Sequence, residues 1–466
     1  MFVAVFVSNV DLFVVNVALP DVGRDFHGAS LGSLSWILNA YAIVFASLLV
    51  VAGRLADRHG QRSGFLLGLG LFTAGSALCA AAGNVPVLVA ARVAQAGGAA
   101  VLLPTSLALM LAVTPAARRP AMVRAWSAVG AVAAALGPVL GGLLVQASWR
   151  WVFVINVPIG VLALVVGIRV LPRLTPDASG PGPDLLGAVL LTASVGALSL
   201  GLVQGNDWGW GSGRVVGSFV AAGVLLALFL AQSRRHPAPM VEMAILRISR
   251  FSTASLATLL FALAFAGMIL SSALWLQNVW GYSALRTGLA MAPGPLMVPP
   301  LAAASGALIK RFGAGPVSAV GNLVFGGGVL YWAANAGAGH HYASDLLPGF
   351  LIGGIGVGLT LPTLTAAGAI ALPPQRFATG SAILTMARQL GSVLGVAVLI
   401  GILGTPHSVA GVVSGYHHGW EGLAAASVLA AGAALAVRRP SPAGQAPAAG
   451  AADSSVGAGP ASLVEQ

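Results

Sequence analysis

Residues 130–160 read GAVAAALGPVLGGLLVQASWRWVFVINVPIG, and this stretch decides the fold. The sequence carries no charge from Ala125 to Ser148, a run long enough to cross a bilayer core of about 30 Å at about 1.5 Å per residue. Four glycines and a proline stand in or near it at helical spacings: Gly130, Gly137, Pro138, Gly141 and Gly142. One face of the helix therefore has almost no side chains, and Pro138 lacks a backbone donor. We expect a membrane-spanning helix that packs closely against a neighbour and can bend.

The composition excludes a water-soluble protein. The chain has 466 residues, of which 57% are apolar and 8% are charged, against roughly 25% charged in soluble domains. The net charge of +11 would favour a nucleic-acid partner in a soluble protein. Here the basic residues fall in short loops between apolar runs, so we read an orientation from them and expect no nucleic-acid partner. The single cysteine, Cys79, excludes a disulfide within the chain.

Fourteen apolar runs of membrane-spanning length predict an all-α polytopic membrane protein. They lie near residues 1–19, 35–53, 63–83, 86–111, 121–146, 151–171, 184–204, 214–232, 252–276, 286–309, 316–336, 346–370, 379–403 and 420–437. Of the 23 Lys and Arg residues, 17 fall on the side of the first residue and four on the other, while Arg92 and Arg388 fall within runs. The positive-inside rule then predicts a protein of the cytoplasmic membrane with both termini in the cytoplasm.

Tryptophans accompany the loops on the opposite side, as an interfacial aromatic belt would require. They are Trp36, Trp149, Trp151, Trp208, Trp210, Trp280 and Trp420. The first span begins at about residue 1, and we expect no cleavable signal peptide because no basic stretch precedes it.

Two loops on the basic side are similar to each other. GRLADRHG at residues 53–60 and GALIKRFG at residues 306–313 share Gly, Leu, Arg and Gly in register. Each follows a predicted span, so duplicated halves are the natural explanation. Counted from these loops, six spans precede the pair at 184–232 and six follow it.

The stretch quoted first resembles the antiporter motif of the major facilitator superfamily, and more narrowly that of its fourteen-helix drug:proton antiporters. A glycine stands seven residues before Gly137-Pro138, then come Gly141-Gly142, Trp149-Arg150-Trp151 and Asn156-Val157-Pro158. The resemblance implies two six-helix bundles, at 1–171 and 251–437, with an inserted helix pair and its flanking loops at 172–250. The Ala-, Gly-, Pro- and Ser-rich tail, 438–466, is predicted to be a disordered cytoplasmic segment.

The loop GRLADRHGQR, residues 53–62, matches the superfamily's loop between helices two and three. The resemblance implies a conformational gating role for five of its residues: Gly53, Asp57, Arg58, Gly60 and Arg62. Lys310 occupies the position of Asp57 in the second copy. Asp57 suits a helix N-terminus, and in related transporters it faces the start of the span that begins here near Thr379.

Asp11 is the only carboxylate well inside a predicted span, in DLFVVNVALP at residues 11–20. A charge at that depth costs at least about 2.5 kcal/mol on insertion scales, so the default reading is functional. The resembling subfamily has an aspartate in a motif that ends with the same NVALP. We expect Asp11 to bind a proton or a cation; the alternative is a structural hydrogen bond to a neighbouring helix.

Two arginines inside spans complete the predicted coupling residues. Arg92, in RVAQAGGAA, is similar to the family's fourth-helix motif, although Ala96 replaces a glycine and puts the closeness of packing in doubt. Its guanidinium is a fixed positive charge that can bias a carboxylate; the alternative is an arginine that snorkels to the membrane surface. Arg388-Gln389 also resembles the subfamily, and there coupling and simple anchoring between helices are equally supported.

Together these features predict a proton-coupled antiporter that exports drug-like, lipophilic or cationic small molecules by alternating access. The alternatives are a proton-coupled exporter of an endogenous metabolite and, from another class, a membrane-bound sensor or enzyme. We expect no enzyme, cofactor or metal, because the sequence has no nucleotide loop and no set of nucleophile, base and orienter. His340-His341 and His417-His418 are interpreted as loop histidines. Protons, the lipid bilayer and the substrate are the expected partners of a monomer.

A largely apolar substrate pocket is a further expectation, although its residues could instead face lipid. It rests on aromatic and methionine side chains in the spans: Trp126, Phe261, Phe265, Met268, Trp275 and Met291.

Overall fold

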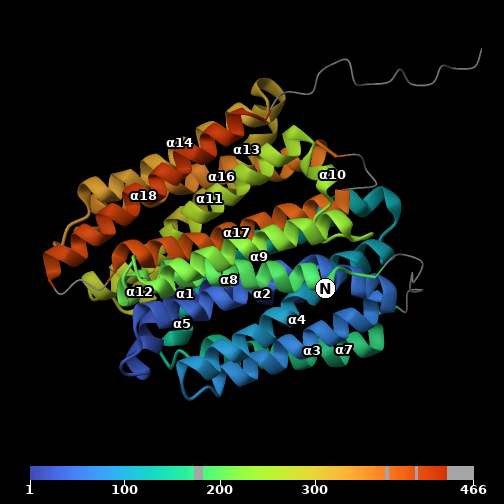
Figure 1. Ribbon diagram of the computed structural model, residues 1–466, viewed down its shortest axis with the longest axis horizontal. Helices are drawn as coiled ribbons and strands as arrows, with labels where there is room; N and C mark the ends of the chain where they lie inside the picture. The colour runs from blue at the N-terminus through green and yellow to red at the C-terminus, as the bar shows by residue number, and fades with distance from the viewer. Residues whose placement is uncertain (173–181, 373–376, 405–407, 438–466) are drawn as a thin grey trace, which may run out of the picture.

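The computed structural model describes residues 1–172, 182–372, 377–404 and 408–437. The regular secondary structure of these residues is all helical, without a strand, and the long helices run roughly along the long axis of the molecule (Figure 1). The first helices are α1 Phe2–Asp25, α2 Leu31–His59, α3 Gln61–Ala80, α4 Val85–Val113, η1 Ala116–Arg118, α5 Arg119–Val145, α6 Trp151–Val154 and α7 Asn156–Val170. Then come α8 Leu185–Trp208, α9 Gly213–Arg235, α10 Met243–Leu246, α11 Ser249–Leu274, η2 Trp275–Val279, α12 Ala284–Met291 and α13 Pro293–Phe312. The last are α14 Ala314–Asn335, α15 Tyr342–Asp345, α16 Leu347–Ile370, α17 Phe377–Leu403 and α18 Val409–Leu435.

Thirteen helical segments of the described chain are long and apolar enough to cross a membrane, and they correspond to the first thirteen predicted spans. The fourteenth long helix, α18, begins at Val409 rather than near residue 420. His417 and His418 therefore lie within a helix, and their interpretation as loop histidines is wrong. Ser408 caps the helix by accepting the Gly411 N–H, so the helix starts before its polar stretch. The structure is consistent with the predicted fourteen spans.

The two similar loops have the same backbone shape. Gly60 joins α2 to α3 with φ 101°, and Gly313 joins α13 to α14 with φ 90°. Positive φ is accessible to glycine at little cost, which explains the shared residue. We call the end of the molecule that holds these two glycines the Gly60 end. The opposite end, where α1 finishes beside Trp149, is the Trp149 end.

Helices α1–α7 form one group and α11–α18 another, with α8 lying against α2 and α17 and α9 packed on α8 (Figure 1). At the Trp149 end α5 packs on α12, whereas α13, which continues toward the Gly60 end, buries only Gly294 and Ser305. The two groups are therefore closely packed at the Trp149 end. The predicted division into bundles at 1–171 and 251–437, with an inserted pair between them, stays a prediction.

The predicted tryptophan belt is wrong for three of its members. Trp149, Trp280 and Trp420 are 3%, 2% and 0% exposed. Their indole N–H groups donate inside the protein, to Asp25 Oδ2 at 2.9 Å, Gly337 O at 2.8 Å and Ser271 Oγ at 3.0 Å, respectively. A buried indole is stable when its donor is satisfied, so these side chains need no membrane interface. Trp151 and Trp210, by contrast, are both 48% exposed.

Candidate functional site

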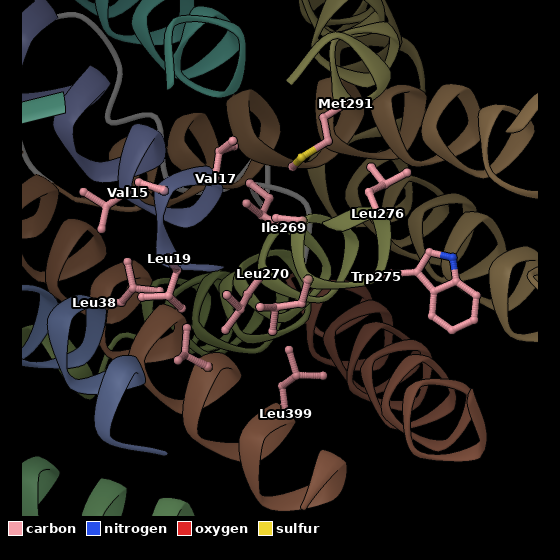
Figure 2. Packing of buried hydrophobic residues seen from close by; sticks show 14 of the residues in the cluster. Val15, Val17, Leu19, Leu38, Ile269, Leu270, Trp275, Leu276, Met291 and Leu399 are labelled. Carbon is pink, nitrogen blue, oxygen red and sulfur yellow. The ribbon is translucent and has the colours of Figure 1, made fainter. Parts of the chain in front are cut away.

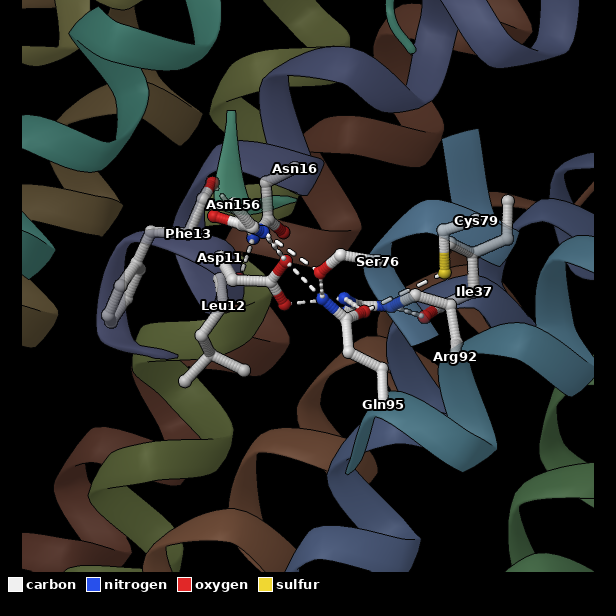
Figure 3. Close-up of polar contacts among 10 residues, drawn as sticks. All are labelled: Asp11, Leu12, Phe13, Asn16, Ile37, Ser76, Cys79, Arg92, Gln95 and Asn156. Carbon is white, nitrogen blue, oxygen red and sulfur yellow. Dashed lines mark hydrogen bonds and ion pairs between the residues drawn. The ribbon is translucent and has the colours of Figure 1, made fainter. Parts of the chain in front are cut away.

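Asp11 lies in the middle of α1 and is 1% exposed. Its Oδ2 accepts a hydrogen bond from Arg92 Nη1 at 2.5 Å. Its Oδ1 accepts from Gln95 Nε2 at 2.8 Å and from Asn156 Nδ2 at 3.1 Å (Figure 3). Three donors from α4 and α7 therefore surround one carboxylate, an arrangement that stabilises its negative charge.

Arg92, on α4, is 0% exposed and does not reach the molecular surface. Its Nε donates to Ile37 O at 3.2 Å, and its Nη1 also donates to Gln95 Oε1 at 2.6 Å. The guanidinium carbon lies 4.0 Å from the centre of the Tyr41 ring and 5.6 Å from that of Phe153. Aromatic faces attract a desolvated cation. Arg92 is thus held inside the helix group instead of snorkelling out of it.

Amide and hydroxyl side chains extend the network, and the sequence interpretation gave them no role. Gln95 Nε2 also donates to Ser76 Oγ at 2.7 Å, and Asn156 Nδ2 approaches the same oxygen at 3.2 Å. Cys79 Sγ lies 3.7 Å from Gln95 Oε1. These side chains are all 2% exposed or less. Polar residues inside apolar runs were the signal that could have identified them.

Glycines bring α3 and α4 close enough for this network to form. A Cβ on Gly75 would lie 2.7 Å from the Gln95 Cα, and one on Gly98 would lie 2.4 Å from the Phe72 N. Neither position accepts a side chain, so the two backbones touch there. Ala96, which put the closeness of packing in doubt, is fully buried in an apolar cluster with Tyr41. The close contact is made by its neighbours.

The buried pair has a clear chemical capacity. Removing a charge from one member leaves the other charge buried without its partner, which is strongly unfavourable. A proton on Asp11 would remove the negative charge that Arg92 contacts, so the guanidinium would be left in this position without that counter-charge. The described residues contain no cluster of three His, Cys, Asp or Glu side chains that could hold a metal.

The glycines of α5 face two different neighbours. Cβ atoms added to Gly137 and Gly141 would lie 2.6 Å from Phe13 Cβ and 2.9 Å from Val14 Cγ2, both on α1. One added to Gly142 would lie 2.5 Å from Ala284 O on α12. On the other side of that contact, a Cβ on Gly288 would lie 2.3 Å from Pro138 O. The predicted motif helix is therefore packed between the two helix groups. Gly130 has room for a side chain, because a Cβ added there would have no neighbour nearer than 3.6 Å among the described residues.

The predicted gating residues lie together at the Gly60 end. Asp57 accepts a hydrogen bond from Gln61 Nε2, and Arg62 Nη2 donates to Ile168 O at the end of α7. Arg58 is exposed, and a Cβ added to Gly53 would lie 3.7 Å from Pro104 Cβ, an ordinary contact distance. Residues 373–376, just before α17, lie outside the described residues, and so does the predicted tail 438–466. The conformational role of the loop stays a prediction.

Arg388 is not part of the Asp11 network. It lies on α17, in the other helix group, with an exposed side chain.

The predicted apolar pocket is partly wrong. Phe261 and Trp275 are 0% exposed and Met291 is 4% exposed, because they pack in the core, whereas Phe265 and Met268 are half-buried against it. Trp126 is half-buried and donates to Ser106 Oγ at 3.2 Å.

Comparison with known proteins gives a consistent result. The model of the Major Facilitator Superfamily matches residues 1–396. The chain is 34% identical to the multidrug resistance protein Stp of Mycobacterium tuberculosis (strain CDC 1551 / Oshkosh), over 85% of this chain and 74% of that protein. It is 35% identical to a probable actinorhodin transporter of Streptomyces coelicolor, over 84% and 70% of the two chains. The crystal structure of an auto-inhibited POT family peptide transporter superposes with a TM-score of 0.66 at 17% identity, covering 94% and 96%, which supports the fold alone.

Proposed function

The chain belongs to the major facilitator superfamily, and on this premise we propose that it exports drug-like small molecules in exchange for protons. It is a multi-pass membrane transporter and not an enzyme. Relatives named for multidrug resistance and for actinorhodin transport support a small-molecule substrate moving outward. The basic loops at the Gly60 end support a cytoplasmic position for that end and for both termini, in the cytoplasmic membrane.

The observation that carries the proton step is the buried pair of Asp11 and Arg92, 2.5 Å apart with both side chains 0% exposed. While Arg92 contacts Asp11, the carboxylate is favoured and the proton leaves. When the helices move and the pair separates, the buried neutral acid is favoured and a proton binds. Alternating access of the site to the two sides of the membrane would then couple inward movement of protons to outward movement of substrate.

Arg388 and the gating loop have supporting roles in this proposal. Arg388 is a second membrane-embedded cation on α17, available to substrate or to the opposite helix group once the conformation changes. Asp57 and its neighbours stabilise the state in which the Gly60 end is closed, as a carboxylate at a helix N-terminus would. We also propose that the transporter works as a monomer.

A two-stage experiment tests the proposal. A growth-inhibition panel in an efflux-deficient host first selects a transported compound. Accumulation of that compound is then measured in inside-out vesicles with and without an acid interior. We expect the pH gradient to drive accumulation by the parent protein, and Asp11→Asn to abolish uphill accumulation while downhill movement continues.

Asp25→Asn is the matched control, because Asp25 is an aspartate of the same helix whose ion pair with Arg150 is partly exposed. It should accumulate the compound as the parent does. Gradient-driven accumulation by Asp11→Asn would show that the proton path lies elsewhere.

A further inference from the structure

The transition from α11 to α12 contains an irregular turn. The α-helix ends at Leu274, and residues Trp275–Val279 form a single π turn, η2. Such turns are rare and occur frequently at functional sites. Gln277 is a buried residue of this turn.

Gln277 bridges the two helix groups. Its Nε2 donates to Val17 O on α1 at 2.8 Å, and the side chain is 6% exposed. Within the described chain its Oε1 is buried without a hydrogen-bond partner. The acceptor is a backbone carbonyl one turn before Pro20, a residue that cannot donate to the helix ladder and loosens this part of α1.

The surroundings of the bridge are apolar. Val17, Ile269, Leu276 and Met291 gather between α1, α11 and α12, with Leu399 of α17 nearby (Figure 2). All of these side chains are 9% exposed or less. In such surroundings a hydrogen bond is strong and an unmade one is costly, because water cannot replace the lost partner.

We propose that Gln277 is a positioning residue for transport: its amide latches the C-terminal helix group to the Val17 carbonyl and holds the Trp149 end closed. This inference rests on the proposed alternating access. Val17 stands six residues after Asp11 on α1, roughly 9 Å along the helix. A shift of α1 that accompanies proton exchange at Asp11 therefore moves the acceptor of the latch, and the two events are mechanically linked.

The test compares Gln277→Leu with Asn278→Leu. Asn278 follows in the same π turn but is exposed, so the control makes the same chemical change without touching the bridge. In a Cys79→Ala background, spin labels at His27 and Ser344 report separation at the Trp149 end, and labels at Ser63 and Lys310 report separation at the Gly60 end. All four positions are exposed. Double electron–electron resonance then gives the populations of the open and closed states in nanodiscs.

We expect Gln277→Leu to raise the ratio of open to closed molecules at the Trp149 end about tenfold, the effect of losing one buried hydrogen bond. Gln277→Glu, which keeps the shape but loses the amide donor, should shift the ratio in the same direction. Asn278→Leu should leave it unchanged. Unchanged distances in both Gln277 variants, or an equal shift in Asn278→Leu, would overturn the latch. The spin-label distances are measured without substrate, so they test the latch independently of transport. The proposed function is refuted separately, if the parent protein shows no gradient-driven export in the vesicle assay.

Discussion

Asp11 and Arg92 should be energetically coupled far more strongly than any exposed pair, and a double-mutant cycle measures this. Both side chains are 0% exposed and their ion pair is 2.5 Å long. Asp11→Asn removes the negative charge, and its new amide meets donors on every side: Arg92 Nη1, Gln95 Nε2 and Asn156 Nδ2. Leaving a buried charge without its partner costs about 3–5 kcal/mol. We expect a loss of that size in the free energy of unfolding.

The double variant Asp11→Asn/Arg92→Gln removes both charges and should be more stable than Asp11→Asn alone, because no unpaired charge remains. Unfolding in mixed micelles, followed by tryptophan fluorescence, supplies the four stabilities of the cycle. Asp25→Asn is the control, since its pair with Arg150 is 38% and 43% exposed and should matter little. The reasoning is refuted if Asp11→Asn is no less stable than Asp25→Asn, or if the two changes at Asp11 and Arg92 simply add.

Three further predictions follow from other parts of the molecule. Gly142→Ala places a Cβ 2.5 Å from Ala284 O and should destabilise the contact between α5 and α12 by about 1–3 kcal/mol, whereas Gly130→Ala should be neutral in the same unfolding assay. Asp57→Asn should slow transport in vesicles without weakening substrate binding, and a loss of affinity at normal protein levels would contradict a purely conformational role. In a Cys79→Ala background, an impermeant maleimide should label Ser344→Cys in intact cells but label Ser63→Cys only after permeabilisation; the reverse pattern would invert the orientation.

The sequence by itself determined that the fold is a bundle of membrane-spanning helices. It also showed which charged residues lie inside the spans. Membrane insertion depends on the transfer free energies of successive residues, so runs of apolar residues identify thirteen of the helices directly. The similar loops ending in Gly60 and Gly313 indicated duplicated halves, and the positive φ of both glycines explains why that residue is shared. Asp11 and Arg92 were recognisable as exceptional because an ionised group inside a span is costly whatever its neighbours are.

Only the tertiary structure decided which groups compensate that cost. Gln95 and Asn156 meet Asp11 from helices 84 and 145 residues away in the chain, and Gln277 meets Val17 across 260 residues. Neither local propensity nor hydropathy encodes these long-range hydrogen bonds. They depend on how the helices pack against one another and on which side-chain rotamers fit between them. The same reason explains the errors at Trp149, Trp280 and Trp420, whose indole donors found partners inside the protein. The sequence shows that a polar side chain inside an apolar run needs a hydrogen-bond partner. Which residue becomes that partner depends on the packing of helices that are distant in the chain.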